Sequence, residues 1–85
     1  MMYSLEFKEV VLKEFKQIPV NEKNKLWTKI QQLKSDPRPI GCRKLVGRDS
    51  DYRIRYGNYR VIYQINEIEK KIIIIQVGHR KDIYR

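Results

Sequence analysis

The chain has 85 residues, of which 19 are Lys or Arg and 10 are Asp or Glu, so its formal net charge at pH 7 is +9. This length fits a single domain, residues 1–85, and leaves no room for a separate cofactor domain. A single cysteine excludes a disulfide within the chain and favours a reducing, cytoplasmic location. One cysteine and one histidine are too few ligands for a metal site, so we expect neither a metal nor another cofactor. The longest apolar run, residues 72–75, is too short to span a membrane, and the N-terminus lacks a signal-peptide pattern.

The positive charge is concentrated in the second part of the chain. All eight arginines lie after residue 37. Arginine makes bidentate contacts with phosphate, whereas lysine acts as a hydrated point charge. The imbalance predicts an anionic partner such as nucleic acid, a membrane surface or an acidic protein, with simple solubility as the alternative.

The first part of the chain predicts one strand and two helices. Residues 3–7 alternate between apolar and polar side chains, as a short strand does. Apolar residues then recur at helical spacing in residues 8–17 and again in residues 20–34, and Pro19 separates the two helices. Pro37 and Pro39 end the second helix. Because the break is so short, the helices should form an antiparallel pair. The periodic positions are Val11, Phe15 and, one residue past the end of the first helix, Ile18, followed by Leu26, Ile30 and Leu33 in the second.

After Pro39 the apolar period changes to two. Residues 40–51 are expected to be a loop with a short extended piece at 44–46, followed by strands at 52–56, 59–65 and 71–77. Gly57 and Asn58 fit a two-residue type II′ turn, and residues 66–70 form a second turn. The resulting order, β-α-α-β-β-β, predicts an α+β domain in which a two-helix hairpin covers one face of an antiparallel sheet.

The short turn fixes the register of the hairpin and sorts its side chains onto two faces. One face is apolar and aromatic, so it should lie under the helices; it holds Tyr52, Ile54, Tyr56, Tyr59, Val61 and Tyr63. The other face holds Arg53, Arg55, Arg60 and Ile62, with Arg55 directly opposite Arg60.

Like charges that face one another destabilise a strand pair, and such local conflicts occur at functional sites. An anion that bridges Arg55 and Arg60 would relieve the repulsion. Two alternatives remain: the side chains could spread into solvent, or Asp49 or Asp51 could neutralise them. We interpret the cluster as a phosphate-binding site.

The C-terminal residues add candidate catalytic groups. If the tail folds back along the sheet, Tyr84 can reach the arginine face that Arg80 also approaches. About one tyrosine in a thousand is ionised at neutral pH, a penalty of about 4 kcal/mol for a general base, and nearby cations reduce it. His79 is a candidate acid or base, although a lone histidine at a strand end is more often a hydrogen-bonded turn residue.

Four segments in this order resemble the RelE/ParE toxin superfamily of type II toxin–antitoxin systems: residues 44–47, 52–55, 59–64 and 77–84. The resemblance implies a metal-independent endoribonuclease that cuts mRNA in the ribosomal A site. The ribose 2′-hydroxyl attacks the adjacent phosphate and leaves a 2′,3′-cyclic phosphate. It further implies a cognate antitoxin, similar to RelB and acidic, through which the pair binds operator DNA.

By position, the resemblance implies catalytic roles for Arg60, Arg80 and Tyr84. Arg53 and Arg55 occupy positions where the best-known member has lysines, and arginine does not readily give up a proton. The general acid is therefore not assigned. The candidates are a water molecule held by Arg80, the side chain of His79 and a ribosomal group. The further RNA-binding candidates are Lys44, Arg48, His79 and Lys81. Alternatives are a DNA gyrase poison similar to ParE and a nucleic-acid-binding module without chemistry.

Overall fold

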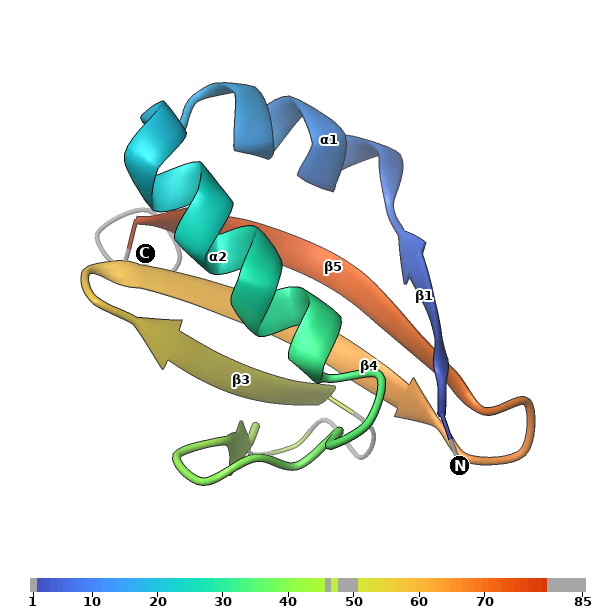
Figure 1. Cartoon of the computed structure of the whole chain (residues 1–85). Helices are drawn as coiled ribbons and strands as arrows, with labels where there is room; N and C mark the ends of the chain where they lie inside the picture. The colour runs from blue at the N-terminus through green and yellow to red at the C-terminus, as the bar shows by residue number, and fades with distance from the viewer. Residues whose placement is uncertain (1, 46, 48–50, 80–85) are drawn as a thin grey trace.

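The computed structural model describes residues 2–45, 47 and 51–79. Strand β1 (Ser4–Phe7) leads into helices α1 (Glu9–Lys16) and α2 (Val20–Gln32). Strands β2 (Arg43–Lys44), β3 (Asp51–Tyr56), β4 (Tyr59–Asn66) and β5 (Lys71–His79) follow. They form one five-stranded sheet in the order β1-β5-β4-β3-β2 (Figure 1). The α+β class and the chain order of the long elements are confirmed.

The sheet is mixed rather than wholly antiparallel. Strands β2 to β5 pair antiparallel as expected, but β1 lies parallel to β5, with Ser4 opposite Lys71 and Phe7 opposite Ile74. The crossover through both helices returns the chain to the opposite edge, so β5 enters between β1 and β4. Pairing over such a sequence distance leaves no local pattern from which its direction could be deduced.

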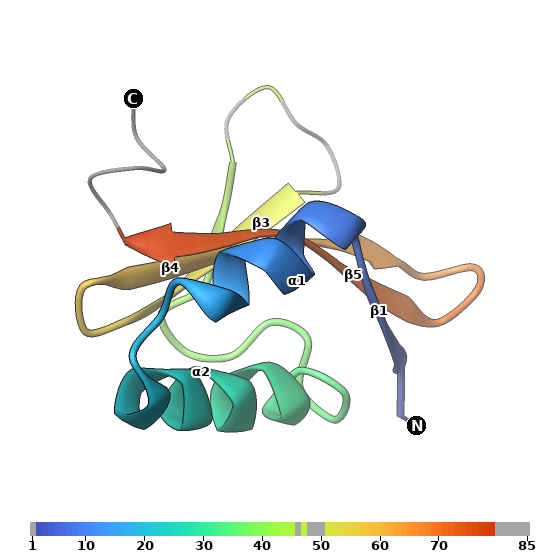
Figure 2. The same cartoon turned by 90° about the horizontal axis from the view of Figure 1, so that it is seen from above.

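Both helices lie on one side of the sheet, and the chain reverses direction between them (Figure 2). The six apolar helix positions predicted from spacing are all buried, and they meet an apolar sheet face. Tyr52, Tyr56 and Tyr59 pack against this core, as the hairpin parity predicted. The buried sheet residues of the core are Ile54, Val61, Tyr63, Ile65, Ile72, Ile74 and Val77. No helix in the part of the chain that the structure describes is long and apolar enough to cross a bilayer.

The hairpin between β3 and β4 has the predicted register. Tyr56 pairs with Tyr59, and Arg55 pairs with Arg60. Gly57 has a φ of 58°, the left-handed value that the first central residue of a type II′ turn requires and that glycine adopts without strain. The turn therefore sets which side chains of both strands face away from the helices.

A bulge in β5 changes its alternation. Ile62 pairs with Gln76 whereas its neighbour Tyr63 pairs with Ile74, so Ile75 is the extra residue. Beyond the bulge Val77 is buried in the core, while Gln76 and Gly78 take the face that carries Ile62. Strand β5 also extends to His79, two residues further than the sequence predicted.

Candidate functional site

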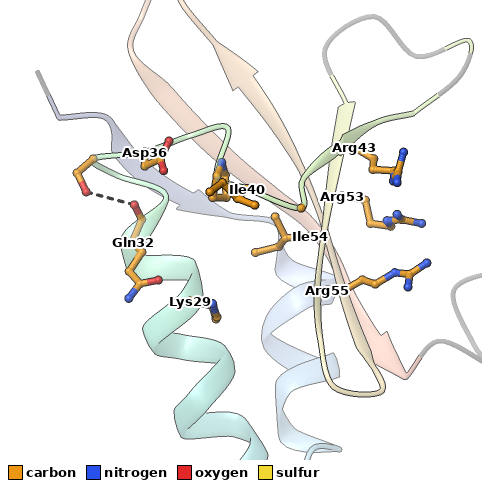
Figure 3. Close-up of a pocket in the computed structure, with 11 residues that line it drawn as sticks. Lys29, Gln32, Asp36, Ile40, Arg43, Arg53, Ile54 and Arg55 are labelled. Atoms are coloured by element: carbon orange, nitrogen blue, oxygen red, sulfur yellow. Dashed lines mark hydrogen bonds between the residues drawn. The ribbon is translucent and has the colours of Figure 1, made fainter.

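The face of the sheet opposite the helices carries the predicted arginines. Arg53 and Arg55 alternate with core residues along β3, and Arg60 on β4 lies directly across from Arg55. Figure 3 shows the side chains of Arg53 and Arg55 pointing away from α2, while Ile54 between them points toward it. The predicted parity is therefore confirmed for these two residues.

Strand β2 adds a fourth arginine that sequence reasoning missed. Arg43 pairs with Arg53 across the two-residue ladder between β2 and β3. Its side chain points the same way as those of Arg53 and Arg55 (Figure 3). A strand of two residues has no periodicity, so only its pairing partner reveals which of its side chains joins the cluster. We call Arg43, Arg53, Arg55 and Arg60 the arginine face.

Lys44 lies on the other side of the sheet. It pairs with Tyr52, which packs against the core under the helices. The extended piece starts at Arg43, one residue before the predicted 44–46. Its register with β3, which the sequence did not predict, places Arg43 and not Lys44 on the side of the arginines. We therefore leave Lys44 out of the proposed site.

Arg60 is the buried member of the arginine face, with 5% of its surface exposed. It lies between Arg55 on β3 and Gly78 on β5. Gly78, which pairs with Arg60 on β5, contributes no side chain beside the guanidinium. The Nη1 atom of Arg60 donates a hydrogen bond of 3.3 Å to the carbonyl of Tyr59. A guanidinium held in this way is ordered and partly dehydrated, which strengthens its attraction for an anion.

The arginine face also includes one carboxylate. Asp51 is 5% exposed and pairs with Gln64, on the same side of β3 as Arg53 and Arg55. The alternative in which Asp51 balances part of the charge is thus compatible with its position. Among the described residues, four arginines against one carboxylate leave a net charge of about +3 on this face, since 4 − 1 = 3. Asp49 lies outside the described residues.

His79 does not join the arginine face. The bulge in β5 turns it to the helix side, where its ring contacts that of Tyr59 edge to face at 5.7 Å between centroids. There it borders a small hollow of about 190 Å³ together with Glu14 and Ile18 of α1 and its loop. The expectation that His79 binds the phosphate with the arginines conflicts with this placement.

A larger hollow of about 560 Å³ lies between the end of α2 and β3. Lys29 and Gln32 border it on the helix, and Ile54 points into it from the sheet (Figure 3). The arginines of β3 form part of its rim, but their side chains extend to the other face. This hollow and the arginine face are therefore two different surfaces.

The comparison with known families decides what kind of protein this is. Residues 3–84 match the family described as the ParE toxin of type II toxin–antitoxin systems. The chain belongs to this ParE toxin family. The resemblance to the RelE/ParE superfamily is confirmed, and the match covers nearly the whole chain.

Several relatives of this ParE-family chain are RelE toxins. It is 32% identical to the mRNA interferase toxin RelE of Escherichia coli over 83 residues, which cover 95% of this chain and 86% of that protein. The archaeal RelE–RelB complex from Pyrococcus horikoshii OT3 contains a chain with 29% identity and a TM-score of 0.83, covering 94% of this chain and 97% of that one. The E. coli RelBE toxin–antitoxin complex gives a TM-score of 0.80 at 29% identity, covering 91% and 95%. The fold is that of RelE.

Four expected site residues of this ParE-family chain lie outside the described residues: Arg48, Arg80, Lys81 and Tyr84. Their roles stay predictions. Among residues 2–45, 47 and 51–79, no three His, Cys, Asp or Glu side chains come together as metal ligands. The guanidinium groups of the described part of the site can bind and stabilise negative charge.

Proposed function

We propose that this chain is the toxin of a type II toxin–antitoxin system and cleaves mRNA in the ribosomal A site as a metal-independent endoribonuclease. The observation that carries the proposal is the buried Arg60 beside Arg55 on the sheet face opposite the helices. It is supported by the relative that is named an mRNA interferase. Because mRNA is the substrate, we place the toxin in the cytoplasm.

In the proposed reaction the ribose 2′-oxygen attacks the adjacent phosphorus, and the bond to the 5′-oxygen of the next nucleotide breaks. Tyr84, as the phenolate, takes the proton from the 2′-hydroxyl. Arg60 and Arg80 hold the phosphate and stabilise the charge that develops on its oxygens, which is usually the largest catalytic contribution. The leaving 5′-oxygen takes a proton from bound water, since arginine remains protonated in proteins.

The remaining basic residues position the RNA strand. Arg53 and Arg55 lie on the arginine face, and Arg48 and Lys81 are expected to add to it. Arginine suits this work because its planar fork contacts two phosphate oxygens at once. The products are a 2′,3′-cyclic phosphate and a free 5′-hydroxyl.

The proposed partner is a cognate antitoxin similar to RelB. Solved structures similar to this chain are RelE–RelB complexes from P. horikoshii and E. coli. The net charge of +9 favours an acidic partner that covers the arginine face, and we propose that the pair binds operator DNA through the antitoxin.

The test is single-turnover cleavage of mRNA on programmed ribosomes, with cuts mapped by primer extension. Arg60→Ala should lower the rate at saturating toxin by about 10²–10³-fold, the scale for one group that stabilises charge in the transition state. Tyr84→Phe should lower it by about 10²–10⁴-fold, as loss of a positioned base does. The matched control is Arg38→Ala, because Arg38 stacks on Tyr52 on the helix side of the sheet.

The proposal is wrong if Arg60→Ala cleaves like the wild type, or if the wild-type toxin makes no cuts. DNA damage without mRNA cuts would instead indicate a gyrase poison. RNA binding with neither cuts nor DNA damage would indicate a module that binds without chemistry.

A further inference from the structure

We propose that Arg43 and Arg53 form a second phosphate-binding site, so that the toxin holds two phosphates of one RNA strand rather than the scissile phosphate alone. This inference rests on the proposed function, because it takes RNA as the ligand of the arginine face. It assigns to Arg43 a role that no sequence pattern indicated.

The pairing of the strands repeats one arrangement twice. Arg55 lies opposite Arg60 across β3 and β4, and Arg43 lies opposite Arg53 across β2 and β3. Neighbouring strands are about 4.8 Å apart, and residues i and i+2 on one strand are about 7 Å apart. The four guanidinium groups thus form a stepped row across three strands, with one arginine pair at each end.

Each pair places two positive charges directly opposite one another. Such an arrangement destabilises a strand pair by some tenths of a kcal/mol, and a bound anion reverses the sign of this contribution. Asp51 is one carboxylate on the face beside Arg53, whereas the row contains four cations. One phosphodiester at each pair would bring the described part of the face close to electrical balance.

The outer members of the row, Arg60 and Arg43, differ in burial, and this difference predicts separate roles. Arg60 is buried against the sheet, whereas Arg43 is exposed at the end of the row. A buried, ordered cation can stabilise a transition state, because no reorganisation is needed when charge develops. An exposed cation contributes mainly to binding and to the direction in which the strand lies. Arg43 should therefore act on affinity, and Arg60 on the rate of the chemical step.

The experiment measures binding of a fluorescein-labelled, 2′-O-methylated hexauridylate by anisotropy between 50 and 300 mM NaCl. The methyl group blocks the attacking oxygen, so that binding is measured without cleavage. For single-stranded nucleic acid, log K falls with log[salt] by about 0.7 for each phosphate neutralised. Arg43→Ala should weaken binding about tenfold at the lowest salt and make this slope shallower by about 0.7. In the ribosome assay the same variant should keep the wild-type rate at saturating toxin and need about tenfold more toxin to reach it.

Neighbouring cations supply the controls. Lys44→Ala removes the same charge one residue further on, from the opposite face, and should weaken binding less than twofold. Arg38→Ala should behave like the wild type, and Arg43→Lys should fall between wild type and Arg43→Ala because it keeps the charge but loses the fork. Circular dichroism checks that each variant is folded.

Equal losses for Arg43→Ala and Lys44→Ala would overturn the proposal, because they would mean that charge anywhere on the edge suffices. A normal affinity for Arg43→Ala with slow cleavage by Arg60→Ala would overturn the second site and leave the nuclease in place. Normal cleavage by Arg60→Ala would remove the proposed function itself, and the second site with it.

Discussion

Tyr63 shows how one buried hydroxyl holds the segment that leads to β2. Its side chain is fully buried in β4, and its hydroxyl donates a hydrogen bond of 2.7 Å to the carbonyl of Pro37. Burial raises the pKa of Tyr63, so the group stays protonated and remains a donor at all ordinary pH values. Tyr52 stacks on the same ring at 5.9 Å, and Arg38 covers Tyr52 in turn. The chain between α2 and Arg43 is thus fastened to the sheet.

Tyr63→Phe should lower the free energy of unfolding by about 1–3 kcal/mol, because the partly buried carbonyl of Pro37 loses its donor. Urea denaturation followed by circular dichroism measures this change. The matched control is Tyr52→Phe, whose hydroxyl accepts a longer bond of 3.3 Å from Arg38, an exposed contact; its cost should stay below about 0.5 kcal/mol. An equal loss of unfolding free energy in the two variants would show that the bond to Pro37 stabilises the fold no more than the exposed bond between Arg38 and Tyr52.

At the scale of elements, the bulge in β5 decides which side chains reach the arginine face. The N–H of Val77, just beyond the bulge, donates a hydrogen bond of 2.9 Å to Oε1 of Glu14 on α1. Without the bulge, Gln76 would turn into the core and Val77 would lie opposite Arg60 in place of Gly78. The contact between α1 and β5 therefore helps to place a glycine rather than a valine opposite Arg60.

Glu14→Ala should destabilise the fold by about 1–3 kcal/mol and speed amide hydrogen exchange at Val77, because a partly buried donor loses its acceptor. Glu14→Gln retains a side-chain oxygen at the same place and should restore most of the protection. Exchange measured residue by residue by NMR separates this local effect from general unfolding, for which Ile72 at the other end of β5 is the internal control. Unchanged exchange at Val77 in Glu14→Ala would show that packing alone holds the bulge.

The sequence predicted those elements that form through local interactions and missed those that depend on residues far apart in the chain. Helical spacing identified six buried apolar positions, four within α1 and α2 and two just beyond their ends. A two-residue turn was sufficient for the hairpin register, and both signals are local. The parallel pairing of β1 and the bulge depend on contacts with β5 and Glu14, more than 60 residues apart in the chain. The two-residue strand β2 exists only through its pairing with β3. These long-range features changed the site by adding Arg43 and moving Lys44 and His79 to the helix side.

For the whole molecule, the distribution of charge is the property that links stability to function. The net charge is +9, and the arginine face places four of the cations together on one side of the sheet. The ion pairs of Arg38 and Lys70 with Glu67, and those of Lys71 with Glu6 and Glu69, join exposed groups. Exposed pairs contribute about 0–1 kcal/mol each, so mutual repulsion among the excess cations should be the larger electrostatic effect.

Salt should consequently stabilise the free toxin. Raising NaCl from 50 to 500 mM shortens the screening length from roughly 14 to 4 Å, which weakens repulsion between cations more than it weakens contacts at ion-pair distance. We expect the midpoint of thermal unfolding to rise by about 4–8 °C, which corresponds to about 1 kcal/mol for a domain of this size.

Sodium phosphate at matched ionic strength should raise the midpoint further, because phosphate binds the folded arginine face and ligands of the native state stabilise it by mass action. Arg60→Ala should keep the response to NaCl and lose most of the additional response to phosphate. A midpoint that falls with NaCl would show that the exposed ion pairs outweigh the repulsion, and an equal phosphate response in Arg60→Ala would place the bound anion elsewhere.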